Sequence, residues 1–596
     1  MKIKYIDGKR FARGIKAGAH AILKKQEHLN KINVFPVPDA DTGTNMAATM
    51  KTVVDNLHPE PEDIGQASTK IADSALEGGR GNSGVILAQF FYGLSKALRR
   101  HKKVNTHQFA EAAESARDHA YSALSQPKEG TILTVIKDWA DNIRENSKFI
   151  HDFEELLTHS LEAAKKSLEN TRNKIEAMRH ANVVDSGAQG FVYLLEGITN
   201  FIKRGRLQNL TSDETLVVES VASTEVLPDQ ITFRYCCECL IEGENIALDE
   251  LREKIEPYGD SIVLAGSPQK ARLHIHTNVP AQVFAQARQY GSLLQQKADD
   301  MLRQYIVSRY PHAPIALVCD SAADLPQEFI DQHNIHVVPV RVAFGSSMYI
   351  DKITITPEIF YQILATEPHH PKTSQPTPAD FRNLYNFLLT HYEAVISVSL
   401  PEAASGTYQN ALSAAKEFPS GKITLIDSYN LSVTFGLVVR KAAELIAAGL
   451  PLEKIVEEVK KFTRRTKIFV YIPNLKFVVR GGRVSKAKGL IANLFNVKPI
   501  LTLNSAGVPV HHSQSYSTKG AIKKTLQIAF NAARQKKDPQ FVIAHANNLP
   551  VAEYYAAEIK KAFGYDPLYI LPASPTLGAH AGNGAVGIGF SWSEDD

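Results

Sequence analysis

The N-terminal third of the chain carries its apolar residues at helical spacing. From about Lys9 to Gly205 they recur every three or four positions, as in GVILAQFFYGLSKALRR, and alternating β-branched runs are scarce. Such periodicity is typical of amphipathic helices. It predicts an all-α domain, a helical barrel or bundle, over residues 1–205.

The pattern changes near Thr215. Four short apolar and β-branched runs predict strands, and two helical stretches, LDELREKIEP and PAQVFAQARQYGSL, lie among them. The strand-like runs are TLVVESV, ITFRYCCECLI, SIVLAG and ARLHIHT. We expect a small α/β domain over residues 212–310.

From Pro314 to the end, strands of the buried type alternate with helical segments. The strand-like runs are IALVCD, AVISVSL, ITLIDS and FVIAHA. This alternation predicts one or two α/β layers over residues 314–596.

Composition narrows the class of protein. A chain of 596 residues is too long for one core, and 44% hydrophobic with 22% charged residues is ordinary for a globular protein. The net charge of +4 is small beside 67 basic and 63 acidic residues, so we expect no nucleic-acid partner. The start lacks signal-peptide character and no apolar run is long enough to span a membrane, which predicts a cytoplasmic protein.

A proline-rich loop carries two aspartates just before a predicted helix. Asp39 and Asp41 lie in NVFPVPDADTGTN, and we expect the helix to begin near Thr44 or Asn45. Carboxylates suit Mg²⁺, which substrate phosphates usually complete, and a helix start offers free N–H groups to an anion. No P-loop lysine follows. The plain alternative is an ordinary turn with a helix cap.

Three further segments in the same domain are glycine-containing entries to helices: EGGRGNSG, PKEGTILT and VVDSGAQG. Taken singly, each is at least as often an ordinary turn. Four such segments in one helical domain favour a nucleotide site.

Together the four segments resemble the nucleotide-binding (DhaL) domain of the dihydroxyacetone kinase family, in the form found in bacterial fatty acid kinases. The resemblance implies ATP with two Mg²⁺ ions held by Asp39 and Asp41, with Asn33 nearby. Ala40 stands where the family usually has glycine. The residues implied to line the nucleotide are Thr44, Asn45, Asn82, Ser83, Gly84, Thr131 and Asp185.

The middle region has YCCEC and HIH in two predicted strands. Residues i and i+2 of a strand face the same side, so His274 and His276 can converge on one ion. From the residues alone, zinc competes with buried cysteines and histidines of an ordinary sheet, and the ordinary sheet is the more frequent case. The segments resemble the middle domain of fatty acid kinase, which implies a structural zinc on Cys236, His274 and His276, far from the phosphates. Cys237 and Cys239 are extra thiols.

Five C-terminal motifs carry hydroxyl, guanidinium and imidazole groups, which together suit a carboxylate. They are CDSAADLP, PKTSQPTP, SGTYQNA, RGGRVS and LGAHAGNGAVGIGF. In order and spacing they resemble the DegV family of fatty-acid-binding proteins, whose fold has two α/β subdomains. The resemblance places Arg483 at the pocket mouth for phosphoryl transfer, and Asn583 stands where proline is usual. The implied fatty-acid head-group residues are Thr373, Ser374, Ser405, Gly406 and His580.

These resemblances imply a single-chain fatty acid kinase that makes acyl phosphate for phospholipid synthesis, with Asp39, Asp41, Arg483 and His580 in the catalytic roles. They further imply a homodimer and a membrane acyltransferase as acceptor. Two alternatives remain open: a kinase for dihydroxyacetone (glycerone) or another small molecule, and a lipid-binding regulatory protein whose kinase domain is inactive.

Overall fold

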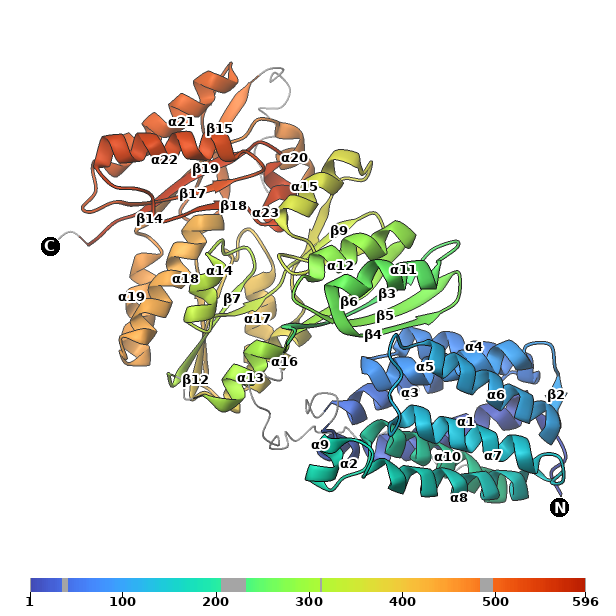
Figure 1. Cartoon of the computed structure of the whole chain (residues 1–596). Helices are drawn as coiled ribbons and strands as arrows, with labels where there is room; N and C mark the ends of the chain where they lie inside the picture. The colour runs from blue at the N-terminus through green and yellow to red at the C-terminus, as the bar shows by residue number, and fades with distance from the viewer. Residues whose placement is uncertain (1, 35–40, 205–231, 311–312, 483–496, 595–596) are drawn as a thin grey trace. The chain divides into compact units, whose positions relative to one another are not determined.

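The structure, a computed structural model, describes residues 2–34, 41–204, 232–310, 313–482 and 497–594 (Figure 1). The chain divides into two compact units: residues 1–279 with 286–301, and residues 280–285 with 302–596. The first unit holds the helical domain and the sheet of the middle region, and the second holds the C-terminal α/β region. The predicted multidomain fold class is confirmed.

The helical domain surrounds an aromatic core. The ring of Phe90 lies 5.2 Å from that of Phe191 and 5.8 Å from that of Trp139, between centroids. The short strands β1 (Ile6–Asp7) and β2 (Lys103–Val104) pair antiparallel. The described helices are α1 (Gly8–Lys24), α2 (Gln26–Lys31), α3 (Thr42–Asn56), α4 (Ile64–Gly78), α5 (Gly81–Leu98), α6 (Thr106–Ser122), α7 (Ile132–Asn146), α8 (Phe153–Thr171), α9 (Glu176–Ala181) and α10 (Ser186–Arg204).

All four segments singled out in the sequence lead into helices, as expected. Helix α3 begins at Thr42, two residues before the predicted start, and α5, α7 and α10 begin inside the other three segments. The polar residues of these segments therefore lie at or beside helix N-termini, where backbone N–H groups lack intrahelical partners.

The middle region forms an antiparallel sheet in the order β4-β5-β3-β6. Its strands are β3 (Tyr235–Glu242), β4 (Gly259–Gly266), β5 (Lys270–Thr277) and β6 (Ser292–Asp300), and its helices are α11 (Leu248–Ile255) and α12 (Pro280–Ala287). The predicted strand TLVVESV lies outside the described residues. The helix predicted to run through GSL is wrong at its end, because α12 stops at Ala287 and β6 starts at Ser292. The polar run SLLQQKADD lacks apolar alternation, and pairing with β3 makes it a strand.

Within the first unit, the sheet packs on the helical domain. The N–H of Gly266 donates to Gln89 Oε1 on α5 at 3.0 Å, and the N–H of Leu264 donates to the carbonyl of Ala123 at 3.0 Å. Lys270 on β5 pairs with Glu77 at 2.8 Å. Buried residues of the sheet belong to the same hydrophobic core as the helices: Leu240, Val263 and Ala265. The two parts therefore form one body.

The second unit has two main sheets, which agrees with the two subdomains expected. One is parallel, in the order β13-β12-β7-β8, and the other is mixed, in the order β16-β15-β14-β19-β17-β18; a small antiparallel sheet has the order β10-β9-β11. The strands are β7 (Ile315–Asp320), β8 (His336–Val338), β9 (Arg341–Phe344), β10 (Ser347–Ile350), β11 (Lys372–Ser374), β12 (Ala394–Ser399), β13 (Ile423–Asp427), β14 (Thr466–Tyr471), β15 (Lys498–Leu503), β16 (Pro509–Ser515), β17 (Gln540–His545), β18 (Ile570–Pro572) and β19 (Val586–Ser591).

Helix α18 contacts strands of both main sheets of this unit, and its buried residues share one core with them. No described helix is both long and apolar enough to cross a membrane. The helices of this part of the chain are α13 (Met301–Arg309), α14 (Gln327–Gln332), α15 (Pro357–Thr366), α16 (Pro378–Leu389), α17 (Thr407–Ala415), α18 (Ser432–Ala447), α19 (Leu452–Phe462), α20 (Leu475–Arg480), α21 (Thr518–Ala533), α22 (Leu549–Phe563) and α23 (Pro575–Ala581).

Candidate nucleotide and lipid sites

A polar pocket of about 240 Å³ lies in the first unit, between the helix starts and the middle sheet. The pocket collects residues from all four glycine-containing segments, which are far apart in the sequence. Asp39 lies outside the described residues. The predicted residues that line the pocket are Asp41, Asn45, Asn82, Ser83, Thr131 and Asp185, and Asn33 joins them.

Two predicted nucleotide residues do not line this pocket. The hydroxyl of Thr44 accepts hydrogen bonds from Asn30 Nδ2 at 3.0 Å and Gln26 Nε2 at 3.2 Å, so it ties α3 to α2. Gly84 packs against α3, where an added Cβ would lie 2.5 Å from the hydroxyl of Thr49. In the structure both residues serve packing between helices.

The start of α5 is shaped for close approach. Gly81 has φ +57°, and a Cβ there would lie 2.3 Å from Asn45 Nδ2. The amide oxygen of Asn82 is buried and has no hydrogen-bond partner among the described residues. A buried amide oxygen normally finds a partner, so this atom is available to a bound ligand.

Asp185 has a structural task beside the pocket. Its Oδ1 accepts the N–H of Ala188 at 2.7 Å, which caps α10, and its own N–H donates to Thr171 at 3.0 Å. Burial raises the pKa of Asp185 to about 6. The residue therefore fixes one wall of the pocket whether or not a nucleotide contacts it.

Cys236, His274 and His276 converge on the face of the sheet that lines the pocket. Their ligand atoms lie within 4.8 Å of one another. His274 is 2% exposed, and its Nε2 has no hydrogen-bond partner among the described residues. Burial, and then the neighbouring His274, lowers the pKa of His276 to about 3, so this ring is neutral at pH 7 as a metal ligand must be. One sulfur and two nitrogens fit Zn²⁺.

The structure separates the two extra thiols from this cluster. Cys237 and Cys239 alternate with Cys236 along β3, so they face the opposite side of the sheet, where both are fully buried. They cannot join the ligand set. The resemblance implies a cluster far from the phosphates, but its three residues line the same pocket as Asp41 and Asn82, which are predicted to hold Mg²⁺ and nucleotide.

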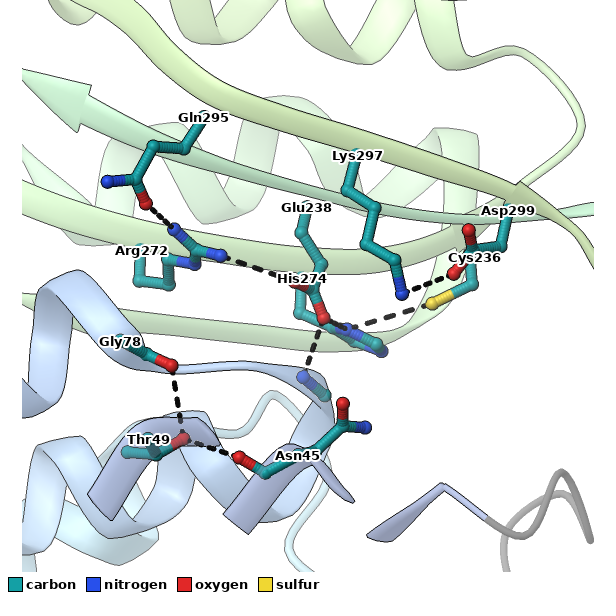
Figure 2. Close-up of polar contacts among 11 residues, drawn as sticks. Asn45, Thr49, Gly78, Cys236, Glu238, Arg272, His274, Gln295, Lys297 and Asp299 are labelled. Atoms are coloured by element: carbon teal, nitrogen blue, oxygen red, sulfur yellow. Dashed lines mark hydrogen bonds and ion pairs between the residues drawn. The ribbon is translucent and has the colours of Figure 1, made fainter. Parts of the chain in front are cut away.

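Two further residues, Glu238 and Lys297, line the pocket but were not predicted from the sequence. Glu238 Oε1 lies 3.3 Å from His274 Nδ1 (Figure 2). The same oxygen accepts the N–H of Gly81 at 2.6 Å. Burial alone would lower the pKa of Lys297, but its ion pair with Asp299 and the nearby charge of Glu238 together raise it. The glutamate of YCCEC lies two positions after Cys236 and therefore on the same face of the strand, which was a usable signal. The polar run containing Lys297 gave none.

The second unit has an apolar cavity of about 140 Å³ with His580 in its wall. The hydroxyl of Thr373 on β11 lies 2.9 Å from His580 Nε2. The structure thus brings two predicted head-group residues together, and one of them, His580, lines the apolar cavity. The other side chains around the cavity are mainly aliphatic, among them Leu431, Ile468, Val470, Ile472, Val478, Leu501 and Leu577.

Of the remaining predicted head-group residues, Ser374 ends β11, and Ser405 and Gly406 directly precede α17. The hydroxyl of Ser405 lies 2.8 Å from that of Thr407, and a Cβ on Gly406 would lie 2.4 Å from Gln375 Nε2, the residue after Ser374. The segments that hold Ser374 and Ser405 are therefore adjacent. Arg483 lies outside the described residues.

Buried carboxylates hold the helix that carries His580. At the start of α23, the N–H of Thr576 donates to Asp351 at 3.1 Å and the N–H of Ser574 donates to Asp324 at 3.3 Å. Lys352 pairs with Asp324 at 2.9 Å. These contacts fix the helix on which the imidazole depends.

Three family models match successive parts of the chain. Residues 36–200 match the DAK2 domain, residues 232–307 match the middle domain of the fatty-acid-kinase-like proteins, and residues 314–592 match the DegV family. One chain carries all three domains. The matches confirm the resemblances that the motifs indicated: the polar pocket lies between the DAK2 domain and the middle domain, and the apolar cavity lies in the DegV domain.

Among curated relatives, an uncharacterized protein of Staphylococcus saprophyticus is 36% identical over 315 residues, which is 51% of this chain and 56% of that protein. An uncharacterized protein of Staphylococcus epidermidis is 34% identical over 317 residues, with shares of 51% and 56%. The chain therefore spans a little over half the length of these relatives.

Among solved structures, a fatty acid binding DegV family protein from Thermus thermophilus is 29% identical and has a TM-score of 0.44. DegV, a fatty acid binding protein from Bacillus subtilis, is 30% identical with a TM-score of 0.44. Each alignment covers 47% of this chain and 100% of the other.

Proposed function

We propose that this protein is a single-chain fatty acid kinase. The first unit binds Mg²⁺-ATP, the DegV domain binds a fatty acid, and the products are acyl phosphate and ADP. The observation that carries the proposal is the presence in one chain of a polar pocket lined by Asp41, Asn45 and Asn82 and an apolar cavity lined by His580, whose ring contacts the hydroxyl of Thr373.

The first unit supplies what a nucleotide needs. Asp41, with Asp39, would hold Mg²⁺, which supplies positive charge to the phosphates when bound. The N-termini of α3 and α5 offer N–H groups to anions. Lys297 adds a cation from the middle sheet to this pocket, where the sequence has no P-loop lysine.

The DegV domain supplies the acceptor. A fatty acid carboxylate, with a pKa near roughly 4 to 5 by analogy with glutamic acid, is already ionised at about pH 7 and needs no general base. Its oxygen attacks the γ-phosphorus, and the bond from that phosphorus to the bridging oxygen of ADP breaks. The Thr373 hydroxyl and the His580 imidazole would hold the carboxylate, and we assign Arg483 to the transferring phosphoryl group.

A protein-bound acceptor follows from the chemistry of the tail. Each methylene buried is worth about 0.8 kcal/mol, so an acyl chain of roughly a dozen methylenes would lose on the order of 10 kcal/mol on entering water. Joining donor and acceptor sites in one chain raises their effective concentration to roughly the millimolar range when the tether spans the gap.

The proposal extends to three further points. We assign a zinc ion to Cys236, His274 and His276, because the donor set and the buried, unpartnered His274 Nε2 fit it. We propose that the chain acts as a homodimer in the cytoplasm, where ATP is available. We also propose that the acyl phosphate passes to a membrane acyltransferase for phospholipid synthesis, since its tail cannot be released into water.

The test is ATP-dependent acyl phosphate formation by the purified chain with oleate or palmitate, trapped as the hydroxamate. We expect product from the wild type and from the control Asp55→Ala, an exposed aspartate on the same helix α3. We expect none from Asp41→Ala and little from His580→Ala. Turnover of glycerone without fatty acid would instead favour a small-molecule kinase, and bound lipid without turnover would favour a carrier with a silent nucleotide domain.

A further inference from the structure

One buried carboxylate contacts both the nucleotide segment and the Cys/His cluster. Glu238 is 2% exposed and projects from β3 toward the start of α5. Its Oε1 lies 3.3 Å from His274 Nδ1 (Figure 2). It also accepts the N–H of Gly81 at 2.6 Å. The two contacts use the same oxygen atom, so a movement of His274 that shifts this oxygen also changes its hydrogen bond to Gly81.

At the helix, Glu238 takes the place of a local cap. The first N–H groups of a helix have no intrahelical partner, and the residue before α5, Arg80, provides no side-chain cap. A hydrogen bond to a carboxylate is about twice as strong as a neutral one, and negative charge is favourable at a helix N-terminus. Glu238 therefore fixes the first turn of α5, which carries Asn82 and Ser83.

At the cluster, Glu238 fixes the tautomer and the orientation of the His274 ring. When Nδ1 donates its proton to the carboxylate, Nε2 is left as a lone-pair donor, and Nε2 is the buried atom without a partner among the described residues. Carboxylates that accept the second N–H of a metal-binding histidine fix its tautomer and orientation. The other oxygen, Oε2, accepts a hydrogen bond from Arg272 Nη2 at 3.3 Å. Arg272 is held in turn by Gln295, to which its Nη1 donates at 2.9 Å. Both oxygens of the carboxylate are therefore fixed.

We propose that Glu238 is a positioning residue that couples zinc occupancy of the Cys236–His274–His276 cluster to nucleotide binding at the start of α5. Zinc on the ring would fix the orientation in which Nδ1 faces Oε1 and Oε1 caps Gly81. Without zinc, the ring is not held in this orientation, and the carboxylate caps α5 less well. This inference rests on the proposed nucleotide site.

Coupling of two binding sites is reciprocal, which gives two independent measurements. In the full-length wild type, zinc should tighten the binding of fluorescently labelled ADP with Mg²⁺ by about 5- to 100-fold relative to the chelator-stripped chain. ADP with Mg²⁺ should tighten zinc binding by the same factor. A zinc-selective competitor dye reports the second constant without any measurement of activity.

Three variants distinguish the effect of the length of the Glu238 side chain from the effect of its charge. Glu238→Asp keeps the charge opposite Arg272 but is one methylene shorter, and should lose the coupling and weaken zinc by about 10-fold or more. Glu238→Gln keeps the length and an acceptor oxygen, and should retain part of both. The control Glu242→Gln changes the same side chain on the same strand, where it pairs with Lys270 at 3.2 Å, and should behave as wild type.

Thermal melting shows which variants remain folded before binding is compared. The proposal is overturned by equal ADP affinity in loaded and stripped wild type, or by a folded Glu238→Asp that couples as the wild type does. If labelled ADP fails to bind the wild type at all, the proposed nucleotide site is wrong. In that event the zinc affinity of Glu238→Asp against Glu242→Gln still decides whether Glu238 acts on His274, and equal affinities would overturn that action too.

Discussion

The Nε2 atom of His580 lies 2.9 Å from the hydroxyl oxygen of Thr373, although 207 positions separate the two residues. The hydroxyl comes from β11 of the small sheet and the imidazole from α23, whose start is fixed by buried carboxylates. The pair sits beside an apolar cavity and is our candidate carboxylate site.

Replacing the hydroxyl tests this site. Thr373→Val keeps the shape of the side chain and removes a hydrogen bond to a charged group, worth about 1.5–3 kcal/mol. We expect oleate affinity, measured by calorimetry, to fall by about 10- to 100-fold. Thr390→Val, an exposed threonine of the same domain, is the control. Equal affinity in both variants would remove Thr373 from the site.

Asp41 should govern the need for magnesium. Asp41→Asn keeps the size of the side chain but loses the charge that suits Mg²⁺. We expect the Mg²⁺ concentration that gives half-maximal ADP binding to rise by about 10-fold or more, with a smaller change at saturating Mg²⁺. Asp55→Asn on α3 should leave the titration unchanged. A magnesium dependence that Asp41→Asn does not alter would contradict this assignment.

The left-handed backbone at Gly81 should matter for binding as well as for folding. An alanine with left-handed backbone angles costs about 1–2 kcal/mol of stability. At Gly81 its Cβ would also lie 2.3 Å from Asn45 Nδ2, so the Asn45 side chain would have to move. We expect Gly81→Ala to weaken ADP binding by about 10-fold or more.

Gly421→Ala is the matched control for the cost of placing an alanine in a left-handed backbone conformation. Its φ is +84°, and a Cβ there would have nothing within 4 Å. We expect a loss of melting temperature with unchanged ADP affinity. ADP binding by Gly81→Ala at the wild-type level would show that Asn45 has no role in the pocket.

The zinc content of the protein should depend on Cys236 and not on Cys237, which lies on the opposite face of β3. Cys236→Ala removes the only sulfur ligand of the cluster, and zinc measured by mass spectrometry should fall from about one per chain to near zero. Cys237→Ala changes the opposite face of the same strand and should keep its zinc. Wild-type zinc in Cys236→Ala, or none in the wild type, would contradict the assignment.

Asp320 should make the stability of the DegV domain depend on pH. Burial raises its pKa to about 7, from about 4 in the unfolded chain. The folded state therefore holds the proton more tightly, and the stabilisation is complete below about pH 4 and is lost as pH rises through about 7.

We expect the stability advantage of the wild type over Asp320→Asn to shrink by about 2–3 kcal/mol between pH 5 and pH 8. Urea unfolding followed in the DegV domain measures it. Asp566→Asn, an exposed aspartate paired with Lys560, should show no such trend. An advantage that stays constant with pH would mean that Asp320 is ionised throughout.

The sequence by itself determined the fold class of the chain and most of its strands. Helical periodicity, buried strand runs and glycine-containing helix entries are local features, so they can be read without coordinates. The convergence of His274 and His276 also followed, because alternation along a strand is local. The start of β6 was missed, since its polar pattern is overridden by pairing with β3.

Only the tertiary structure decided which residues meet. It showed that the Cys/His cluster shares a pocket with Asp41, that Thr44 faces α2, and that Glu238 reaches Gly81 across 157 positions. Contacts between distant segments depend on how the sheet packs against the helices, and no local pattern encodes that packing. For the same reason the pairing of Thr373 with His580 could be expected from the family resemblance but not from the spacing of the residues.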